Sequence, residues 1–105
     1  MLDQLSNTEQ DILNVIKTVI DPEVAINIVD LGLIYEVHHN AAEKTIHVVM
    51  TLSARGCPVG DTIIQHVETV VSSNYLAYAV SVELVWEPTW TPSLITEAGK
   101  EALNQ

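Results

Sequence analysis

The sequence predicts an α+β fold in which helices pack on a small mixed three-stranded sheet. Two observations carry this prediction: two apolar stripes of helical period, and three shorter segments in which apolar and polar residues alternate. A chain of 105 residues, 48% of them hydrophobic, is long enough for one core and too short for two ordinary domains. We therefore expect residues 1–105 to form a single domain, with elements in the order α-β-β-α-β-α and the helices on one side of the sheet.

The first helix is predicted over about residues 6–20. Ser6 and Glu9 have the spacing of a capping box, and the apolar residues that follow recur at helical intervals. Asp21-Pro22 ends the helix, because the residue before a proline is disfavoured in the α region. The next segment, up to Gly32, shows no clean period, and we expect it to be an ordered loop.

Two strands are predicted to form a hairpin. Residues 33–39 alternate, which groups Leu33 and Tyr35 on one face and Ile34 with Glu36 on the other. Residues 40–44 supply a polar turn. A second strand over residues 45–52 follows, with one apolar face made by Ile46, Val48, Met50 and Leu52.

The second half of the chain predicts a helix, a strand and a short final helix. An apolar stripe of helical period runs to about Asn74, and because proline is favoured at the first helical position, Cys57 is expected at the N-cap. The third strand is expected over about residues 78–86. Thr91-Pro92 can open a final helix, which Gly99 weakens.

The charge balance restricts the kind of partner. The formal net charge is -10, with 14 acidic residues against 4 Lys and Arg. The resulting negative electrostatic field disfavours binding to nucleic acid and anionic membranes, and it favours basic proteins as partners. Because no apolar run approaches the roughly 20 residues that span a bilayer, and the N-terminus lacks a signal-peptide pattern, we expect a cytoplasmic protein.

Cys57 is the centre of the predicted functional site. The N-terminus of a helix stabilises thiolate over thiol, as does nearby Arg55, whereas Asp61 opposes it. A thiolate binds iron, but one cysteine is one ligand, and an iron–sulfur cluster needs about four. A cluster would therefore have to be shared across a dimer or with small thiols. On spacing alone, Cys57 could equally be a small buried residue that precedes a helix.

The remaining polar residues carry weaker signals. Asp21 and Asp30 lie in acidic stretches in which each carboxylate can cap a turn. The chain contains no C-x-x-C, H-E-x-x-H or paired Cys and His motif, so a complete zinc site is not predicted. We interpret His38, His39 and His47 as ordinary strand residues.

Five short segments, spread in order over nearly the whole chain, resemble those of a known family. They are DPE at 21–23, DLGLIY at 30–35, VVMTL at 48–52, GCP at 56–58 and WEPTWTP at 86–92. Together they resemble the MIP18 family of small domains, whose stand-alone members are similar to the bacterial SufT-type iron–sulfur maturation factors. The related PaaD-type proteins carry further cysteines toward the C-terminus, and none follows Cys57 here.

The resemblance implies a site and a function. It makes Cys57 the reactive cysteine and the metal ligand, and the function a non-enzymatic one: assembly of iron–sulfur clusters and their transfer to client proteins. It implies a transient cluster or iron shared between chains, with no tightly bound cofactor. The implied partners are cluster scaffolds or carriers and client apoproteins, and the resemblance is compatible with a homodimer. The implied site-lining residues are Asp21, Glu23, Asp30, Gly32, Thr51, Pro58, Trp90 and Thr91.

Two alternatives remain open at this point. The chain can be an interaction adaptor in which Cys57 is structural. It can also be a cysteine-dependent enzyme, with Asp21, Asp30 or His47 as the base, although the sequence supplies no recognisable pair of base and orienting group. One departure from the family pattern is Thr89, where the family usually has a second proline.

Overall fold

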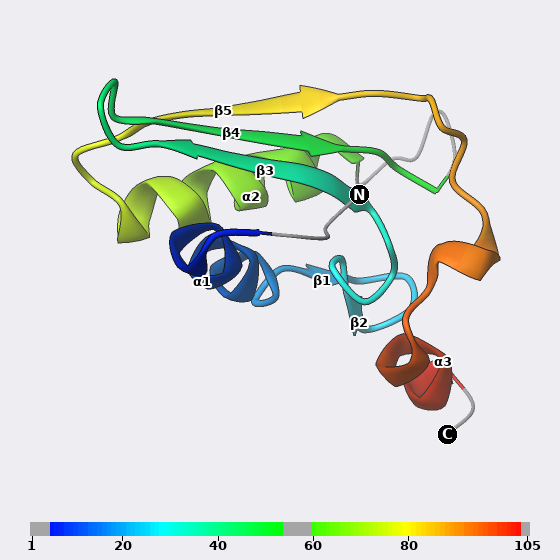
Figure 1. Ribbon diagram of the computed structural model, residues 1–105. Helices are drawn as coiled ribbons and strands as arrows, with labels where there is room; N and C mark the ends of the chain where they lie inside the picture. The colour runs from blue at the N-terminus through cyan, green and yellow to red at the C-terminus, as the bar shows by residue number, and fades with distance from the viewer. Residues whose placement is uncertain (1–4, 54–59, 104–105) are drawn as a thin grey trace.

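The computed structural model describes residues 5–53 and 60–103 (Figure 1). Its elements are α1 (Asn7–Ile16), β1 (Ile20–Asp21), β2 (Ile26–Asn27), β3 (Ile34–Asn40), β4 (Thr45–Met50), α2 (Gly60–Asn74), β5 (Ala79–Leu84), the 3₁₀ helix η1 (Pro92–Leu94) and α3 (Glu97–Leu103). The predicted α+β class and its order are confirmed, with one additional two-stranded sheet. Within the described ranges, no helix is both long and apolar enough to cross a membrane.

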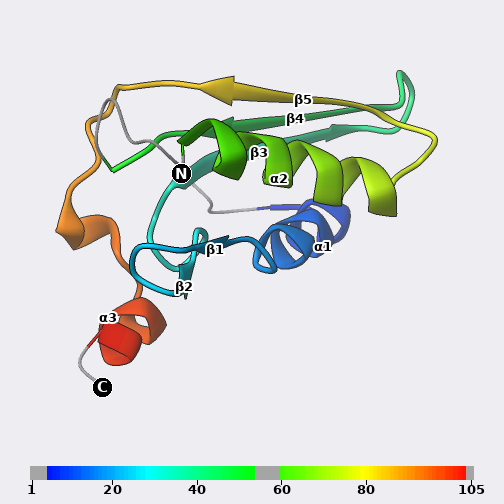
Figure 2. The ribbon, with the colours of Figure 1, turned by 180° about the vertical axis from the view of Figure 1, so that it is seen from behind.

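The main sheet has the order β3-β4-β5. Strands β3 and β4 are antiparallel, whereas β4 and β5 are parallel. A parallel pair needs a crossover connection, and α2 supplies it. Helices α1 and α2 lie on the same face of this mixed sheet (Figures 1 and 2), whereas α3 contacts β2 beside the end of the sheet. The opposite face of the sheet, which we call the outer face, carries none of the helices of residues 5–53 and 60–103 (Figure 1).

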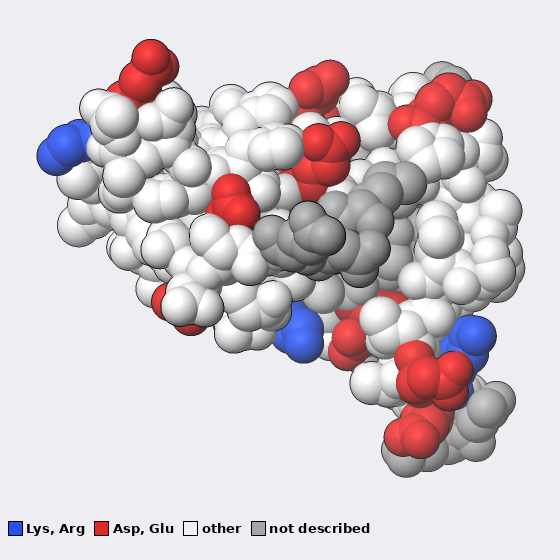
Figure 3. All heavy atoms as spheres, in the orientation of Figure 1, with Lys and Arg blue, Asp and Glu red and all other residues white. Residues whose placement is uncertain are grey.

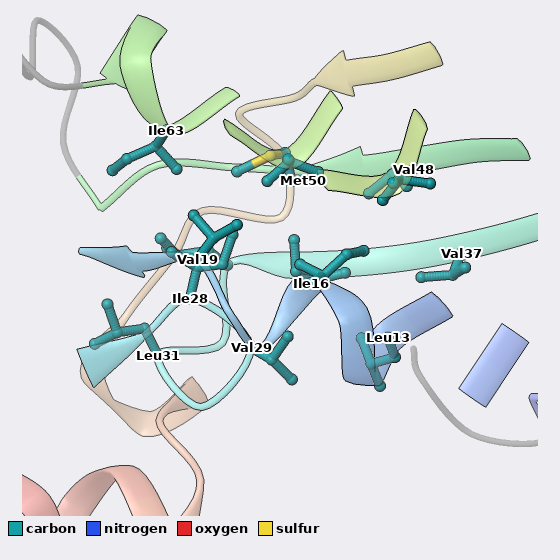
Figure 4. Packing of buried hydrophobic residues seen from close by; sticks show 14 of the residues in the cluster. Leu13, Ile16, Val19, Ile28, Val29, Leu31, Val37, Val48, Met50 and Ile63 are labelled. Carbon is teal, nitrogen blue, oxygen red and sulfur yellow. The ribbon is translucent and has the colours of Figure 1, made fainter. Parts of the chain in front are cut away.

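The core lies between this sheet and the two helices (Figure 4). Helical spacing directs the same side of each helix inward, and strand alternation directs every second residue of β4 toward them. The buried residues that meet there include Ile12, Leu13, Ile16, Val37, Ile46, Val48, Met50, Ile63, Val67 and Val71. Because these contacts fix both helices against the sheet, they also fix the end of the sheet at which the predicted site lies.

Helix α1 begins with the predicted capping box but ends earlier than predicted. The Ser6 hydroxyl accepts from the Glu9 N–H, and Glu9 Oε1 accepts from the Ser6 N–H. Hydrogen bonds from the backbone N–H of Ser6 and, with a smaller effect, from that of His39 lower the pKa of the Glu9 carboxyl. The helix ends at Ile16, because Ile20, which fits the apolar period, pairs with β2 as a strand residue.

The segment expected to be a loop contains a small hairpin. Ile20 pairs with Asn27, and Asp21 pairs with Ile26, in an antiparallel two-stranded sheet. The turn includes Ala25 at φ 59°. Strands of two residues are too short to show alternation, which is why the sequence gives no sign of them.

A β-bulge changes the predicted faces of β3. Ile34 pairs with Met50, but Glu36 pairs with Val49, so the register shifts between Ile34 and Glu36. The extra residue moves Ile34 into the core, whereas the predicted grouping placed it with Glu36. Tyr35 is also buried, at 3% exposed, but it lines a hollow on the outer face and is not part of the core cluster that contains Leu33. The predicted faces of Ile34 and Tyr35 are therefore wrong.

Candidate functional site

Seven of the predicted site residues lie in the described part of the chain. Cys57 and Pro58, and with them the predicted N-cap, fall outside the described residues. They belong to the segment that joins Ser53, beyond the end of β4, to Gly60, the first residue of α2. The geometry below is that of the residues predicted to surround Cys57.

Asp30 connects the β1–β2 hairpin to the C-terminal helix. Its Oδ2 accepts a hydrogen bond of 2.8 Å from the side-chain amide of Asn27, and its Oδ1 accepts one of 3.0 Å from the Thr96 hydroxyl. The Thr96 backbone N–H also donates to the Asp30 carbonyl over 2.8 Å. Both carboxylate oxygens are therefore engaged, and Asp30 acts as a clamp between the hairpin and α3.

Two glycines allow close backbone approach beside this clamp. Gly32 has φ +80°, and a Cβ there would lie 2.8 Å from both the carbonyl carbon and the Cβ of Leu94. At Gly99, a Cβ would lie 2.8 Å from the Asp30 carbonyl oxygen. Glycine at Gly99 weakens a helix, as the sequence predicts, but here it also lets α3 reach Asp30.

Trp90 and Thr91 lie in the loop that follows β5. The indole Nε1–H of Trp90 donates to the Leu31 carbonyl over 2.8 Å, so the ring is held against the turn that contains Asp30 and Gly32. Thr91 is exposed and its hydroxyl is 2.6 Å from that of Ser93. Trp90 therefore forms part of the framework, whereas Thr91 faces the surrounding solvent.

Thr51 joins the end of β4 to the same turn. It is only 1% exposed, and its backbone N–H donates to the Leu33 carbonyl over 2.8 Å. Asp30, Gly32, Thr51 and Trp90 are thus brought together where β4 ends and the chain continues toward Cys57.

Asp21 ends β1, and Glu23 lies in the turn of the β1–β2 hairpin. Asp21 is 7% exposed, and its Oδ1 accepts from the Glu23 N–H over 2.9 Å. This bond gives Asp21 the turn-capping role that its local sequence predicts. The Glu23 side chain is exposed.

Sequence reasoning missed two features of the outer face. The Tyr35 hydroxyl donates to the Pro88 carbonyl over 2.7 Å, and burial, followed by the charge of Glu87, raises the pKa of Tyr35. His38 lies directly opposite His47, with their rings stacked 6.4 Å apart. The predicted turn at residues 40–44 places His38 opposite Ile46, one position short of His47, because Asn40 is in fact the last residue of β3. The bulge at Tyr35 has no sequence signal.

The described residues make a framework and not a metal centre. Across residues 5–53 and 60–103, no three His, Asp or Glu side chains converge on a point where a metal ion could bind. The contacts around Asp30, Gly32 and Trp90 are mostly to backbone groups, which makes this end of the sheet rigid. A soft metal ligand would have to come from Cys57, the single cysteine of the chain.

These features define a class of small α+β domains in which helices cover one face of a mixed sheet and loops gather at one end of that sheet. Residues 9–84 match the model of the iron-sulfur cluster assembly protein family, and the chain belongs to this family. This result confirms the resemblance to MIP18-type domains.

Individual relatives cover most of the chain. The Fe-S protein maturation auxiliary factor SufT of Staphylococcus aureus is 42% identical, over 82% of this chain and 97% of its own. The Fe-S protein maturation auxiliary factor of Porphyromonas gingivalis is 39% identical, over 92% of this chain and 91% of its own. The crystal structure of a domain of unknown function, DUF59, from Bacillus anthracis superposes with a TM-score of 0.85 at 32% identity, over 91% of each chain.

Proposed function

We propose that this protein is a non-enzymatic iron–sulfur maturation factor that delivers clusters to client proteins, or assists their transfer, through Cys57. One observation carries the proposal: relatives that are 39% and 42% identical over most of the chain are named Fe-S protein maturation auxiliary factors. The gathering of Asp30, Gly32, Thr51 and Trp90 at the end of β4 supports it, because that end leads directly to the Cys57 segment.

The cluster is cargo in this proposal. A cluster needs about four ligands, and Cys57 supplies one sulfur, so the others come from a second copy, a partner protein or small thiols. Such a shared ligand set suits transfer, because a cluster that one protein does not fully enclose can exchange its ligands stepwise. It also accounts for a chain with a single cysteine and no other ligand motif.

The contacts of two candidate bases support a function other than catalysis. Both carboxylate oxygens of Asp30 accept hydrogen bonds. Both ring nitrogens of His47 are engaged on the outer face, Nδ1 with the Ser81 hydroxyl and Nε2 with Glu83. Neither group is poised to take a proton from a thiol, as a cysteine-dependent enzyme requires.

The proposed setting follows from thiol chemistry. A thiolate that exchanges iron must remain reduced, and cytosolic thiols are kept reduced. We therefore assign the protein to the cytoplasm, with cluster scaffolds or carriers and client apoproteins as its partners.

The test uses a host strain that lacks this protein and a client enzyme that requires an iron–sulfur cluster. Wild-type chain should restore client activity, and Cys57→Ala and Cys57→Ser should not, although all are expressed and folded to the same extent. Ser53→Ala, which removes an exposed hydroxyl four positions before Cys57, is the matched control and should restore activity. Full rescue by Cys57→Ser would refute the proposal and favour an adaptor with a structural cysteine.

A further inference from the structure

The outer face of the sheet carries a polar hollow that the proposed site does not use. Its volume is about 310 Å³, and it lies on the face opposite to α1 and α2. Strands β3, β4 and β5 supply its floor, and the segment after β5 supplies one wall. The residues that line this outer hollow are Tyr35, Glu36, His38, His47, Val49, Glu83, Val85, Glu87 and Pro88.

Two histidines hold two of the carboxylates in place. His38 Nε2 lies 2.7 Å from Glu36 Oε1, and His47 Nε2 lies 2.9 Å from Glu83 Oε1. The Glu36 and Glu83 side chains nevertheless remain 48% and 56% exposed. Because these carboxylates are already oriented, a partner that binds them loses less side-chain entropy.

The charge of the outer hollow has one sign. Three glutamates line it, and no Lys or Arg is among its lining residues. In Figure 3 acidic atoms lie along the upper margin and near the middle of this view, and others lie toward the bottom, whereas the basic atoms lie only at the left tip and in the lower parts. Val85 and Pro88 add accessible apolar surface beside the buried Tyr35 and Val49, and the methylene groups of a long basic side chain can pack against it.

We propose that the outer hollow docks a segment of a partner protein that bears Arg or Lys side chains. Their cationic ends contact Glu36, Glu83 and Glu87, and their stems pack on the apolar floor. The proposal rests on the proposed function only in that the partner would be a cluster carrier or client, and it requires no participation of Cys57. A sheet with one face uncovered then has one face for its own core and one for its partner.

The test uses a fluorescent eight-residue peptide in which Arg and Val alternate. Binding is measured by anisotropy, and the contact surface is mapped by amide chemical shifts. We expect shift changes in β3, β4 and residues 83–88. The triple variant E36Q/E83Q/E87Q should weaken binding about tenfold, which is what three solvent-exposed ion pairs of ordinary strength are together worth.

The matched control is D11N/E68Q/E101Q, which removes the same charge from exposed positions on α1, α2 and α3. It should change the affinity less than twofold. Equal weakening by both triple variants would overturn the proposal, because the peptide would then sense only the total charge. Chemical shift changes confined to other surfaces would also overturn the proposal. A dimer that is detected by sedimentation and dissociated by E36Q/E83Q/E87Q would overturn it as well.

The two proposals fail separately. If the peptide does not bind and Cys57→Ala still abolishes client maturation, only the docking surface is wrong. If the peptide binds as expected and Cys57→Ala cells mature their clients normally, only the proposed function is wrong.

Discussion

Replacing Gly32 by alanine should destabilise the protein by an amount that the structure allows us to estimate. At φ +80°, alanine is strained in the left-handed region by about 1 kcal/mol. The added Cβ also meets the backbone of Leu94, so the turn and η1 must move apart. That movement weakens two adjacent hydrogen bonds, from Trp90 to the Leu31 carbonyl and from Thr96 to the Asp30 carbonyl.

Each of these two bonds is worth about 1 kcal/mol, so with the strain the loss should be about 3 kcal/mol. Since small proteins are stable by only about 5–15 kcal/mol, this is a large share of the total. The free energy of unfolding is measured by urea titration. A nuclear magnetic resonance spectrum reports separately on the indole N–H of Trp90, which should lose protection against hydrogen exchange.

Ala25 provides the matched control, because it is an exposed residue that also has positive φ, at 59°. Ala25→Gly relieves the backbone strain without removing a contact of the framework, and it should change the stability by no more than about 1 kcal/mol. If Gly32→Ala costs no more than this, and the indole N–H of Trp90 keeps its protection, the close packing of the turn on η1 does not stabilise the fold as argued.

Three further predictions concern single contacts. Trp90→Phe should lower the free energy of unfolding by about 1–3 kcal/mol, since it leaves the Leu31 carbonyl without its donor, and an unchanged urea midpoint would contradict this. The backbone N–H of Ser6 is the first cause of the lowered pKa of Glu9, so the ionised carboxylate stabilises the fold above its ordinary pKa of 4.5. This contribution is lost as pH falls through the lowered pKa, and the stability gap between wild type and Glu9→Gln should close in acid and not widen. Tyr35→Phe, which removes one hydrogen bond to the loop after β5, should cost about 1 kcal/mol by the same titration, whereas no change would show that this bond does not contribute.

The parts of the fold that the sequence predicted depend on long periodic patterns. The stripes of α1 and α2 and the alternation of β4 are confirmed, because each buries one face against the others. The patterns failed where one residue changes the register or where an element is very short. The bulge at Tyr35 changes which residues of β3 face the core. It can be recognised only from the pairing of β3 with β4. The two-residue strands of the hairpin are likewise specified by pairing and not by period.

The residues of the site were named from motifs, but their contacts required the structure. The local sequence indicates that Asp30 lies in a turn, whereas its bond to Thr96 spans 66 positions of the chain. From the sequence, Gly99 is only a residue that weakens a helix. The structure shows that the Asp30 carbonyl lies beside it. Partners so distant in sequence leave no local pattern, so their meeting could not be derived from spacing.

The two proposals assign cluster transfer and partner docking to different parts of the fold. Asp30, Gly32 and Trp90 contact side chains and backbone groups of their own chain, so this end of the sheet is held together without a partner. The outer hollow is built differently, because the Glu36 and Glu83 side chains remain about half exposed while a histidine holds each carboxylate. Under the proposed function, a chain that supplies one sulfur cannot hold a cluster alone, so its affinity for the cargo would depend on the partner that completes the ligand set. A docking surface separate from the thiol would let that partner be chosen before the cluster moves.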